Sequence, residues 1–426
     1  MHILIIGAGP GGYEIAAEAA KRGLEVTLVT DGPLGGTCLN EGCIPTKTLI
    51  HSCCELSEEL SCAIERKENV ISQLRAGIES ILKNVEIVYG KASFIDAHTV
   101  KVNEREIAAD KIIICTGSVS SSLPVPGAGL AIDSSEILKL DSVPQRLAII
   151  GGGVIGLEFA GIFNSLGCKV TVIEYCPNIL PRMDSDLAKR LKQQMSRSGV
   201  SFILGAAVTA VENNGQDGFT VRYNEKDKMC HIVADKVLMA VGRRPNVDDL
   251  NLDGVSVEYG PKGIKVDSGM RTNVPDIYAA GDVTGGYMLA HVASAQGMRA
   301  LNDITGTKDS INFECVPAVV FTNPEFASVG LSEDDCRARG VEYTVHKSFY
   351  RANGKAVSSG QTDGLCKVIC DNQGKIIGCH ILGACASTMI GEAAVLVALG
   401  VDLEKAKWII HAHPTLSEVL MNALRS

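Results

Sequence analysis

Gly7-Ala8-Gly9-Pro10-Gly11-Gly12 decides the fold of the first part of the chain. It follows an apolar run from Ile3 to Ile6 and precedes a helical pattern from Tyr13 to Arg22, after which Glu25 to Val29 has the pattern of a second strand. A strand, a glycine-rich turn, a helix and a strand in this order are typical of a dinucleotide-binding unit.

The three glycines of this G-x-G-x-x-G spacing have separate tasks. Gly7 permits the tight turn, Gly9 lets the backbone approach a pyrophosphate, and Gly12 lets the helix pack closely on the strand. The unpaired N–H groups and the dipole at the helix N-terminus favour the anion. An acid that binds the adenosine ribose is expected at the end of the second strand, where the chain has Thr30 and Asp31, and either could serve.

A second unit of the same kind begins at Arg146. Leu147 to Ile150 has a strand pattern, Gly151 to Gly156 repeats the glycine spacing, and the strand pattern Lys169 to Ile173 ends at Glu174. A carboxylate at this place accepts the two ribose hydroxyls and repels a 2′-phosphate, which favours NAD over NADP. Two such units in one chain suggest electron transfer between two bound nucleotides.

The stretch GGTCLNEGCIPTK, residues 35–47, contains two cysteines five positions apart, Cys38 and Cys43. On a regular helix their Cα atoms would lie roughly 8–9 Å apart, whereas a disulfide needs about 4.4–6.8 Å. A bond between them would therefore distort the turn, which Gly42 permits. A strained disulfide is easily reduced and suits a redox catalyst. Two buried free thiols are the alternative that the spacing leaves open.

The bulk properties narrow the class of protein. At 426 residues the chain is too long for one core, so two to four domains are expected. The net charge of −9 argues against nucleic acid and anionic membranes as partners. The odd count of fifteen cysteines, and a first strand that follows Met1 without a signal peptide, favour free thiols in a reducing cytoplasm. The apolar stretch Ile376 to Val401 predicts a strand and a buried helix, not a membrane span.

Other patterns place further candidate residues. Thr48 to Lys83 predicts one helix, and Glu86 to Val102 alternates like strands. Asp282 follows a buried strand pattern from Ile277 to Ala280, beside Gly281, where a carboxylate can bind a ribityl or ribose hydroxyl.

The last part of the chain has a different character. From about Ile311, alternating strands and two helices without a glycine fingerprint predict an α+β module. Near its end His413 precedes Glu418 by five positions, across Pro414. A carboxylate so placed can fix the tautomer of the ring and raise its basicity. The pair is therefore either a general base with its orienting acid or a structural hydrogen bond.

The order of these segments resembles the flavin-dependent pyridine nucleotide–disulfide oxidoreductases over nearly the whole chain. The resemblance runs through GAGPGG (7–12), GGTCLNEGCIPTK (35–47), CTGS (115–118), GGGVIGLE (151–158), AVGRRPN (240–246), YAAGD (278–282), MLAH (288–291), FTNPEFASVG (321–330), ANGKA (352–356) and HAHPTLSE (411–418). The MLAH and ANGKA segments and the paired histidines are most similar to the branch that oxidises dihydrolipoamide.

The resemblance implies an α/β fold with two Rossmann-like domains, one for FAD and one for NAD, and a C-terminal α+β dimerisation domain. It assigns residues 1–120 and 245–310 to the FAD-binding domain, 121–244 to the NAD-binding domain and 311–426 to the interface of a homodimer. The implied activity is oxidation of protein-bound dihydrolipoamide to lipoamide with NAD⁺. The implied partners are lipoyl domains, with the acyltransferase of a multienzyme complex or a glycine-cleavage carrier protein.

The resemblance also implies a role for each catalytic residue. Cys38 meets the substrate, and Cys43 is the thiolate that stacks on the flavin. His413, from the other subunit of the dimer, deprotonates the substrate thiol, and Glu418 orients it. Lys47 lies near the flavin and is paired with Glu158.

Two sets of cofactor-binding residues follow from the glycine motifs and the resemblance. Those for FAD are Gly7, Gly9, Gly12, Thr30, Asp31, Thr37, Lys47, Ala92, Thr116, Gly117, Asp282, Met288, Leu289, Ala290 and His291. Those for NAD are Gly151, Gly153, Val154, Ile155, Gly156, Glu158, Glu174, Val208, Gly242 and Arg243. No metal site is expected.

Three alternatives stay open. A glutathione-reductase-like enzyme would need cations for the peptide carboxylates, yet Ala17 and Glu18 stand where such reductases carry arginines. A mercuric-reductase-like enzyme would need a further cysteine pair, and residues 413–426 contain none. A non-catalytic flavoprotein of a complex is the third. The chain is also shorter than typical members of the family, mostly between the cysteine segment and Glu86.

Overall fold

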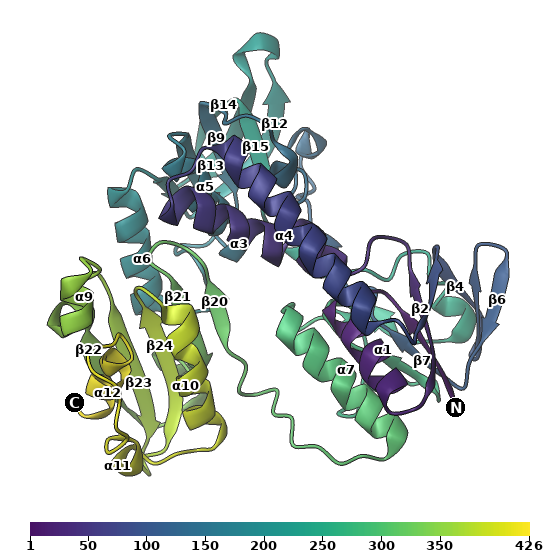
Figure 1. Ribbon diagram of the computed structural model, residues 1–426. Helices are drawn as coiled ribbons and strands as arrows, with labels where there is room; N and C mark the ends of the chain where they lie inside the picture. Colours follow the sequence, from purple (N-terminus) through teal and green to yellow (C-terminus); the bar gives the residue numbers. More distant parts are fainter.

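Five parallel strands form the sheet of the first nucleotide unit in a computed structural model that describes residues 1–426 (Figure 1). Their order is β19-β7-β1-β2-β3. The strands are β1 (His2–Ile6), β2 (Glu25–Thr30), β3 (Glu86–Tyr89), β7 (Lys111–Ile114) and β19 (Ile277–Ala279). The apolar runs of β1, β2, β7 and β19 are buried on both faces, as is usual in parallel sheets, whereas the edge strand β3 is partly exposed.

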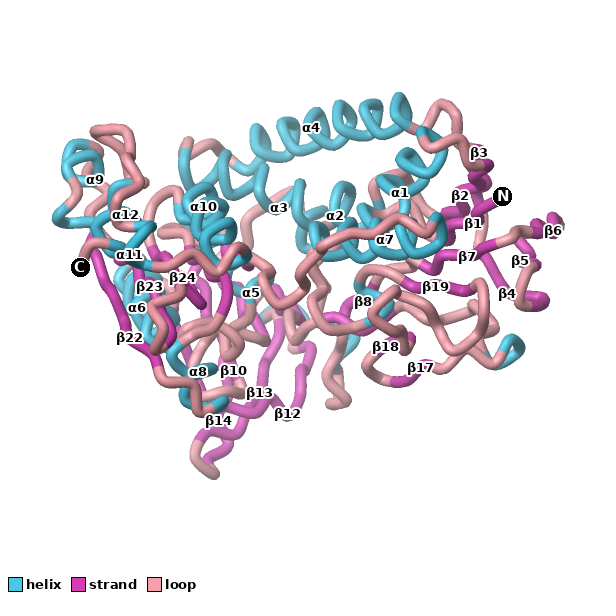
Figure 2. The backbone as a smooth tube through the Cα atoms, turned by 90° about the horizontal axis from the view of Figure 1, so that it is seen from below, coloured by secondary structure: helices cyan, strands magenta, loops and turns pink.

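Two helices cover one face of this sheet. They are α1 (Pro10–Lys21) and α7 (Ala290–Thr305), which run side by side in Figure 2. Glycines allow the close approach: a Cβ on Gly11 would lie 3.2 Å from the Cβ of Ala293, and one on Gly297 would overlap the Ile15 side chain. The other face is covered by an antiparallel meander whose buried residues share one core with it, formed by β4 (Ala92–Asp96), β5 (Thr99–Val102) and β6 (Arg105–Ala108).

The second nucleotide unit has a four-stranded parallel sheet in the order β11-β10-β9-β15. Helices α5 and α6 pack with it, and an antiparallel sheet of β12, β13 and β14 adjoins it. The bounds are β9 (Arg146–Ile150), α5 (Val154–Ser165), β10 (Lys169–Glu174), α6 (Ser185–Arg197), β11 (Ser201–Leu204), β12 (Ala206–Asn213), β13 (Phe219–Glu225), β14 (Lys228–Ala234) and β15 (Lys236–Met239).

Two connections join the nucleotide units. Strand β8 (Ser118–Ser120), on the way out, pairs antiparallel with β16 (Arg243–Pro245), on the way back. The two crossing segments therefore lie side by side, and residues far apart in the sequence meet there.

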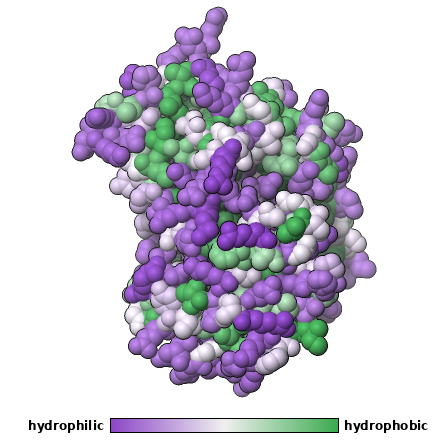
Figure 3. All heavy atoms as spheres, turned by 90° about the vertical axis from the view of Figure 1, so that its left-hand side faces the viewer, coloured by the Kyte–Doolittle hydropathy of each residue, from purple (hydrophilic) through white to green (hydrophobic).

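The C-terminal part is an antiparallel sheet in the order β20-β21-β24-β23-β22, with helices packed on it (Figure 1). The strands are β20 (Ala318–Val320), β21 (Phe326–Gly330), β22 (Tyr343–Phe349), β23 (Leu365–Asp371) and β24 (Ile376–Leu382). The helices are α8 (Glu333–Arg339), α9 (Gly354–Ser358), α10 (Ala386–Ala398), α11 (Leu403–Ala406) and α12 (Glu418–Leu424). Figure 3 shows the side of the molecule on the left of Figure 1, which is mostly hydrophilic with scattered apolar patches.

The single helix predicted for Thr48 to Lys83 is wrong. The structure has α3 (Cys43–Leu49), a π-helical turn (Ile50–Glu55) and, after a break, α4 (Leu60–Ile81). Ser57 in the break has φ +57°, a left-handed conformation that ends a right-handed helix. Helix α4 begins beside the second unit, where the ammonium of the buried Lys67 donates to the carbonyl of Leu138, and it runs back to the first unit (Figure 1).

No helix of the structure has both the length and the apolar composition that a bilayer crossing would need.

Candidate active site

The two cysteines lie on separate short helices that meet at Gly42. Helix α2 (Gly36–Glu41) carries Cys38, and Cys43 is the first residue of α3. Gly42 has φ −142° and ψ −111°, and a Cβ there would lie 2.9 Å from the carbonyl oxygen of Thr37. The distortion expected from the spacing is therefore present, and glycine is what makes it possible.

The two thiols are both reduced and contact each other. A hydrogen bond from the Cys38 thiol, together with the charge of Lys47, lowers the pKa of Cys43 to about 7 despite burial. The same hydrogen bond and burial raise the pKa of Cys38 well above the usual range of a thiol. The dithiol form therefore has a thiolate at Cys43 and a protonated thiol at Cys38, and a low-pKa thiol is the better leaving group from a disulfide.

Lys47 and Glu158 form an ion pair between α3 and α5. The ammonium lies 3.0 and 2.8 Å from the two carboxylate oxygens, and it also lies 4.7 Å from the centre of the Phe321 ring. The backbone N–H of Phe321 donates to Glu158 at 3.0 Å. The Glu158 side chain is 4% exposed and that of Lys47 is 30% exposed. The pairing implied by the resemblance is thus present, one turn from Cys43.

The glycine turn of the first unit lies against the cysteine segment. A Cβ on Gly36 would be 2.7 Å from the Cα of Gly9, whereas a Cβ on Gly9 would meet nothing within 4 Å. Gly9 is the N-cap of α1, so open space adjoins the N–H groups at the start of that helix. A pyrophosphate fits this cradle, and a cofactor bound there would lie next to Cys38 and Cys43.

Asp282 is mostly buried and belongs to a chain of hydrogen bonds. Ser118 donates to its carboxylate at 2.5 Å, and the Arg243 guanidinium donates to Ser118 at 2.7 Å. Burial raises the pKa of Asp282. Arg243, which we expected at the NAD site, thus lies at the β8–β16 crossing and points towards the FAD side. Thr116 is bonded to the carbonyl of Asn246 at 2.6 Å, also at this crossing.

The other expected FAD residues lie around the same sheet. Thr30 is buried and bonds locally to Gly32, whereas the Asp31 side chain is exposed and makes no hydrogen bond, so Asp31 is the freer of the two for a ribose. Ala92 is buried at the start of β4. Thr37 lies in α2, and Gly117 follows β7. The N-terminus of α7 contains Ala290 and His291, directly after Met288 and Leu289.

The second glycine turn has a similar geometry. Gly151 has φ +114°, a Cβ on Gly153 would meet nothing within 4 Å, and one on Gly156 would overlap the carbonyl of Gly151. Glu174 ends β10, and its two oxygens accept from the N–H groups of Gly152 at 2.5 Å and Cys176 at 2.7 Å. Each oxygen keeps a lone pair, so the residues fit the ribose and pyrophosphate of NAD.

The remaining residues of the expected NAD set are less specific. Val154, Ile155 and Gly156 form the first turn of α5, and Gly242 has φ +110° beside open space. Val208 lies at an irregularity of the β12–β13 pairing.

The chain is similar to one family of known proteins over both of its parts. The chain matches the family described as pyridine nucleotide-disulphide oxidoreductase over residues 1–297, and the dimerisation domain of the same family over residues 316–424. The chain belongs to this family.

Relatives with curated names cover almost the whole chain. A dihydrolipoyl dehydrogenase of Chlamydia muridarum is 39% identical over 98% of this chain and 94% of its own. One of Geobacillus stearothermophilus is 39% identical over 99% of this chain and 94% of its own.

Solved structures are similar over the same extent. The HOCl-induced flavoprotein disulfide reductase RclA of Escherichia coli, as its Cu(II) complex, has a TM-score of 0.91 at 31% identity and covers 98% of both chains. LpdA of Mycobacterium tuberculosis has a TM-score of 0.92 at 29% identity, with 100% of this chain and 99% of the other covered. The family uses FAD and NAD, and both predicted cofactors are confirmed.

His413 and Glu418 lie apart from Cys38 and Cys43 of the same chain. His413 and Glu418 are in the C-terminal domain, whereas α2 and α3 adjoin the FAD sheet (Figures 1 and 2). The His413 Nδ1 lies 2.9 Å from Glu418, and the side chain is 76% exposed. The dimerisation domain supports the predicted homodimer, in which an exposed histidine of one subunit can meet the partner.

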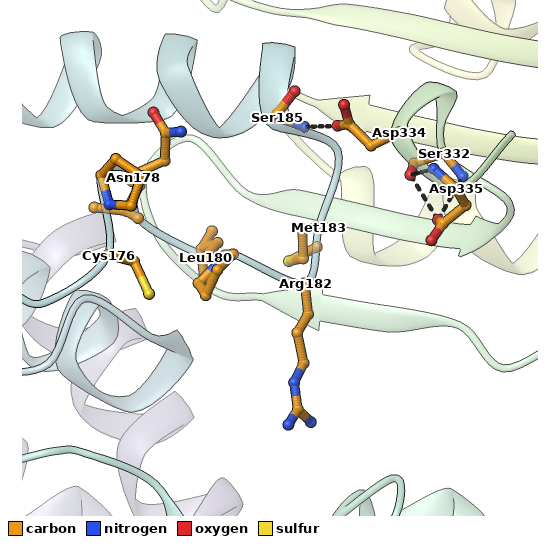
Figure 4. Close-up of a pocket in the computed structure, with 12 residues that line it drawn as sticks. Cys176, Asn178, Leu180, Arg182, Met183, Ser185, Ser332, Asp334 and Asp335 are labelled. Atoms are coloured by element: carbon orange, nitrogen blue, oxygen red, sulfur yellow. Dashed lines mark hydrogen bonds between the residues drawn. The ribbon is translucent and has the colours of Figure 1, made fainter. Parts of the chain in front are cut away.

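The pocket in Figure 4 lies elsewhere. It is lined by the loop after β10, from Cys176 to Met183, and by Ser185, Ser332, Asp334 and Asp335 near the start of α8. The Ser185 N–H donates to Asp334 at 3.2 Å across it. None of the expected site residues lines this pocket, so it is a junction between domains and not the redox site.

Four residues near the site were not assigned a role from the sequence. Ser118 links Asp282 to Arg243, and Phe321 packs on Lys47. Asn40, between the cysteines, bonds the carbonyls of Leu34 and Gly36 and accepts from Arg75 of α4. Ser118, Phe321 and Asn40 fall inside the CTGS, FTNPEFASVG and GGTCLNEGCIPTK segments, which is the one signal that could have indicated them. Arg75 lies in no such segment.

Proposed function

We propose that the protein oxidises protein-bound dihydrolipoamide to lipoamide with NAD⁺, through a redox-active Cys38–Cys43 disulfide and FAD. The observation that carries this proposal is the pair of thiols of unequal pKa, placed beside the glycine turn of the first nucleotide unit. The curated names of relatives at 39% identity support the substrate class.

The thiol chemistry is an exchange in two steps. A substrate thiolate attacks the sulfur of Cys38, and the Cys43 sulfur leaves as a thiolate, which the positive charge of Lys47 stabilises. The second substrate thiolate then attacks the sulfur that is bound to Cys38, which closes the substrate disulfide and releases Cys38. The substrate loses two electrons and the cysteine pair gains them. FAD, when bound, supplies the path by which these electrons reach NAD⁺ as hydride.

We propose that the base for both deprotonations is His413 of the second subunit. Its Nδ1 is engaged with Glu418, which leaves Nε2 for a substrate thiol. The Glu418 carboxylate is itself fixed by the Thr415 N–H at 2.9 Å, and that bond and His413 lower its pKa. A carboxylate held in this way orients the ring and fixes the tautomer that carries its proton on Nδ1.

Lipoyl domains are the proposed protein partners, in a 2-oxoacid dehydrogenase complex or the glycine-cleavage system. A reducing cytoplasm is the proposed location, because an odd count of fifteen cysteines in a chain of this length favours mostly free thiols.

A steady-state assay of the purified holoenzyme tests the proposal. Dihydrolipoamide and glutathione disulfide are each supplied with NAD(H) and with NADP(H). Turnover of dihydrolipoamide with NAD⁺, well above the other three combinations, is expected. Preferred turnover of glutathione disulfide would overturn the substrate, and a preference for NADP(H) would overturn the role of Glu174.

A further inference from the structure

His411, two positions before His413, differs from it in burial and in its hydrogen-bond partners. His411 Nε2 lies 2.8 Å from a carboxylate oxygen of Glu392 on α10, and Nδ1 lies 3.1 Å from the carbonyl oxygen of Ile409. The side chain of His411 is 5% exposed, against 76% for His413. Both ring nitrogens of His411 are engaged, so it has no free nitrogen for a substrate proton.

The large apolar residues just before His411 face outward. Trp408 is 75% exposed and Ile410 is 93% exposed, although both are large and apolar. The His411 ring is thus the side chain of this loop that turns inward and joins it to α10. Glu392 belongs to α10, whose neighbouring residues Met389 and Leu396 are packed in the core of the C-terminal domain.

The other attachments of the loop lie after His413. Thr415 donates to the carbonyl of Ala412 at 2.8 Å, and Asn353 donates to the carbonyl of Thr415 at 3.0 Å. Glu418 holds both the His413 ring and the Thr415 N–H. On the N-terminal side of His413, the bond between His411 and Glu392 is the side-chain anchor.

We propose that His411 is a positioning residue: bound at both ring nitrogens, it fixes the loop from Ile409 to His413 on α10, so that His413 is presented to the cysteine pair of a second copy. This inference rests on the proposed function of His413 as the base. Removal of the anchor leaves the base present but displaced, and a displacement of about 1 Å can cost on the order of a hundredfold in rate.

The test measures two half-reactions of the holoenzyme in rapid mixing, reduction by dihydrolipoamide and reduction by NADH. The variants are His411→Ala, Glu392→Ala and the double variant. We expect each to slow reduction by dihydrolipoamide about ten- to a hundredfold, with reduction by NADH unchanged. Because the two residues act as one unit, the double variant is expected to be no slower than the slower single variant. Glu392→Gln, which keeps an oxygen acceptor, is expected to recover part of the rate.

The control is His98→Ala, which changes an exposed histidine near a carboxylate of the FAD-binding part and is expected to match the wild type. Equal slowing of both half-reactions, loss of the dimer in light scattering, or additive effects in the double variant would each overturn the positioning role. If the wild type itself is not reduced by dihydrolipoamide, the proposed function fails and the inference fails with it. Variants at the wild-type rate, with an active wild type, would overturn this inference alone.

Discussion

The Lys47 ammonium lies 2.8 Å from the Glu158 carboxylate and thereby joins the cysteine helix α3 to the first helix of the NAD-type unit. The two residues are 111 positions apart in the chain. The charge that lowers the pKa of Cys43 is thus held in place by a carboxylate from the second nucleotide unit. One ion pair therefore connects the proposed redox pair with the helix whose N-terminus is the proposed site of the NAD pyrophosphate.

Replacement of Lys47 by Met is expected to leave Glu158 buried with only the N–H of Phe321 as a partner. The cost is about 1–3 kcal/mol of the free energy of unfolding, reduced from the value of a fully buried pair because Lys47 is partly exposed. Chemical denaturation measures it, and the double variant with Glu158→Gln is expected to recover most of the loss. A double variant less stable than Lys47→Met would contradict the pairing.

The Cys43 thiol of the reduced enzyme is expected to titrate near pH 7, whereas a free thiol has a pKa of about 8.5. Because folding lowers the pKa of Cys43, the ionised thiol stabilises the folded protein. This contribution to the free energy of unfolding is fully present above the ordinary thiol pKa and is lost as the pH falls through about 7. Alkylation of Cys43, mapped by mass spectrometry against pH, measures the value. Cys38→Ala removes the hydrogen bond and is expected to move the midpoint upward; an unmoved midpoint speaks against that bond.

Gly36→Ala is expected to weaken FAD binding, because a Cβ at φ +56° would lie 2.7 Å from the Cα of Gly9 and push the cysteine segment from the glycine turn. The flavin content of the purified protein measures this. Gly77→Ala in α4 is the matched control, since its Cβ meets nothing within 4 Å, and it is expected to be neutral or to stabilise by about 0.5–1 kcal/mol. Full flavin content in Gly36→Ala would refute the close approach.

His413→Gln is expected to slow reduction by dihydrolipoamide far more than reduction by NADH, because its ring touches neither nucleotide turn. A trans arrangement makes a further prediction. When Cys43→Ser and His413→Gln subunits are mixed, half of the dimers carry one intact site, so about a quarter of the wild-type activity should return. No recovery in proven heterodimers would place the base in the same chain as the cysteines.

Features that depend only on neighbouring residues can be predicted from the sequence. The two glycine turns, with their strands and helices, follow from Gly7 to Gly12 and from Gly151 to Gly156, because backbone space at each glycine is set by its immediate neighbours. The break before α4 could not be predicted in this way. It depends on the left-handed conformation of Ser57 and on the contact of Lys67 with the carbonyl of a distant residue.

The same distinction applies to the site. The distorted turn at Gly42 follows from the five-residue spacing, and the His413–Glu418 contact is also local. Ser118 is 125 positions from Arg243 and 164 positions from Asp282. The pairing of β8 with β16 brings these residues together, and the sequence did not predict it. Such contacts depend on how distant strands pair, which no short sequence pattern indicates.

The proposed mechanism requires that Cys38 and Cys43 form the disulfide that oxidises dihydrolipoamide. A single-turnover experiment with dihydrolipoamide, on the wild type and on Cys43→Ser with full flavin content, tests it most directly. We predict rapid flavin reduction in the wild type and none in the variant. Flavin reduction by dihydrolipoamide at a near wild-type rate in Cys43→Ser would contradict the claim.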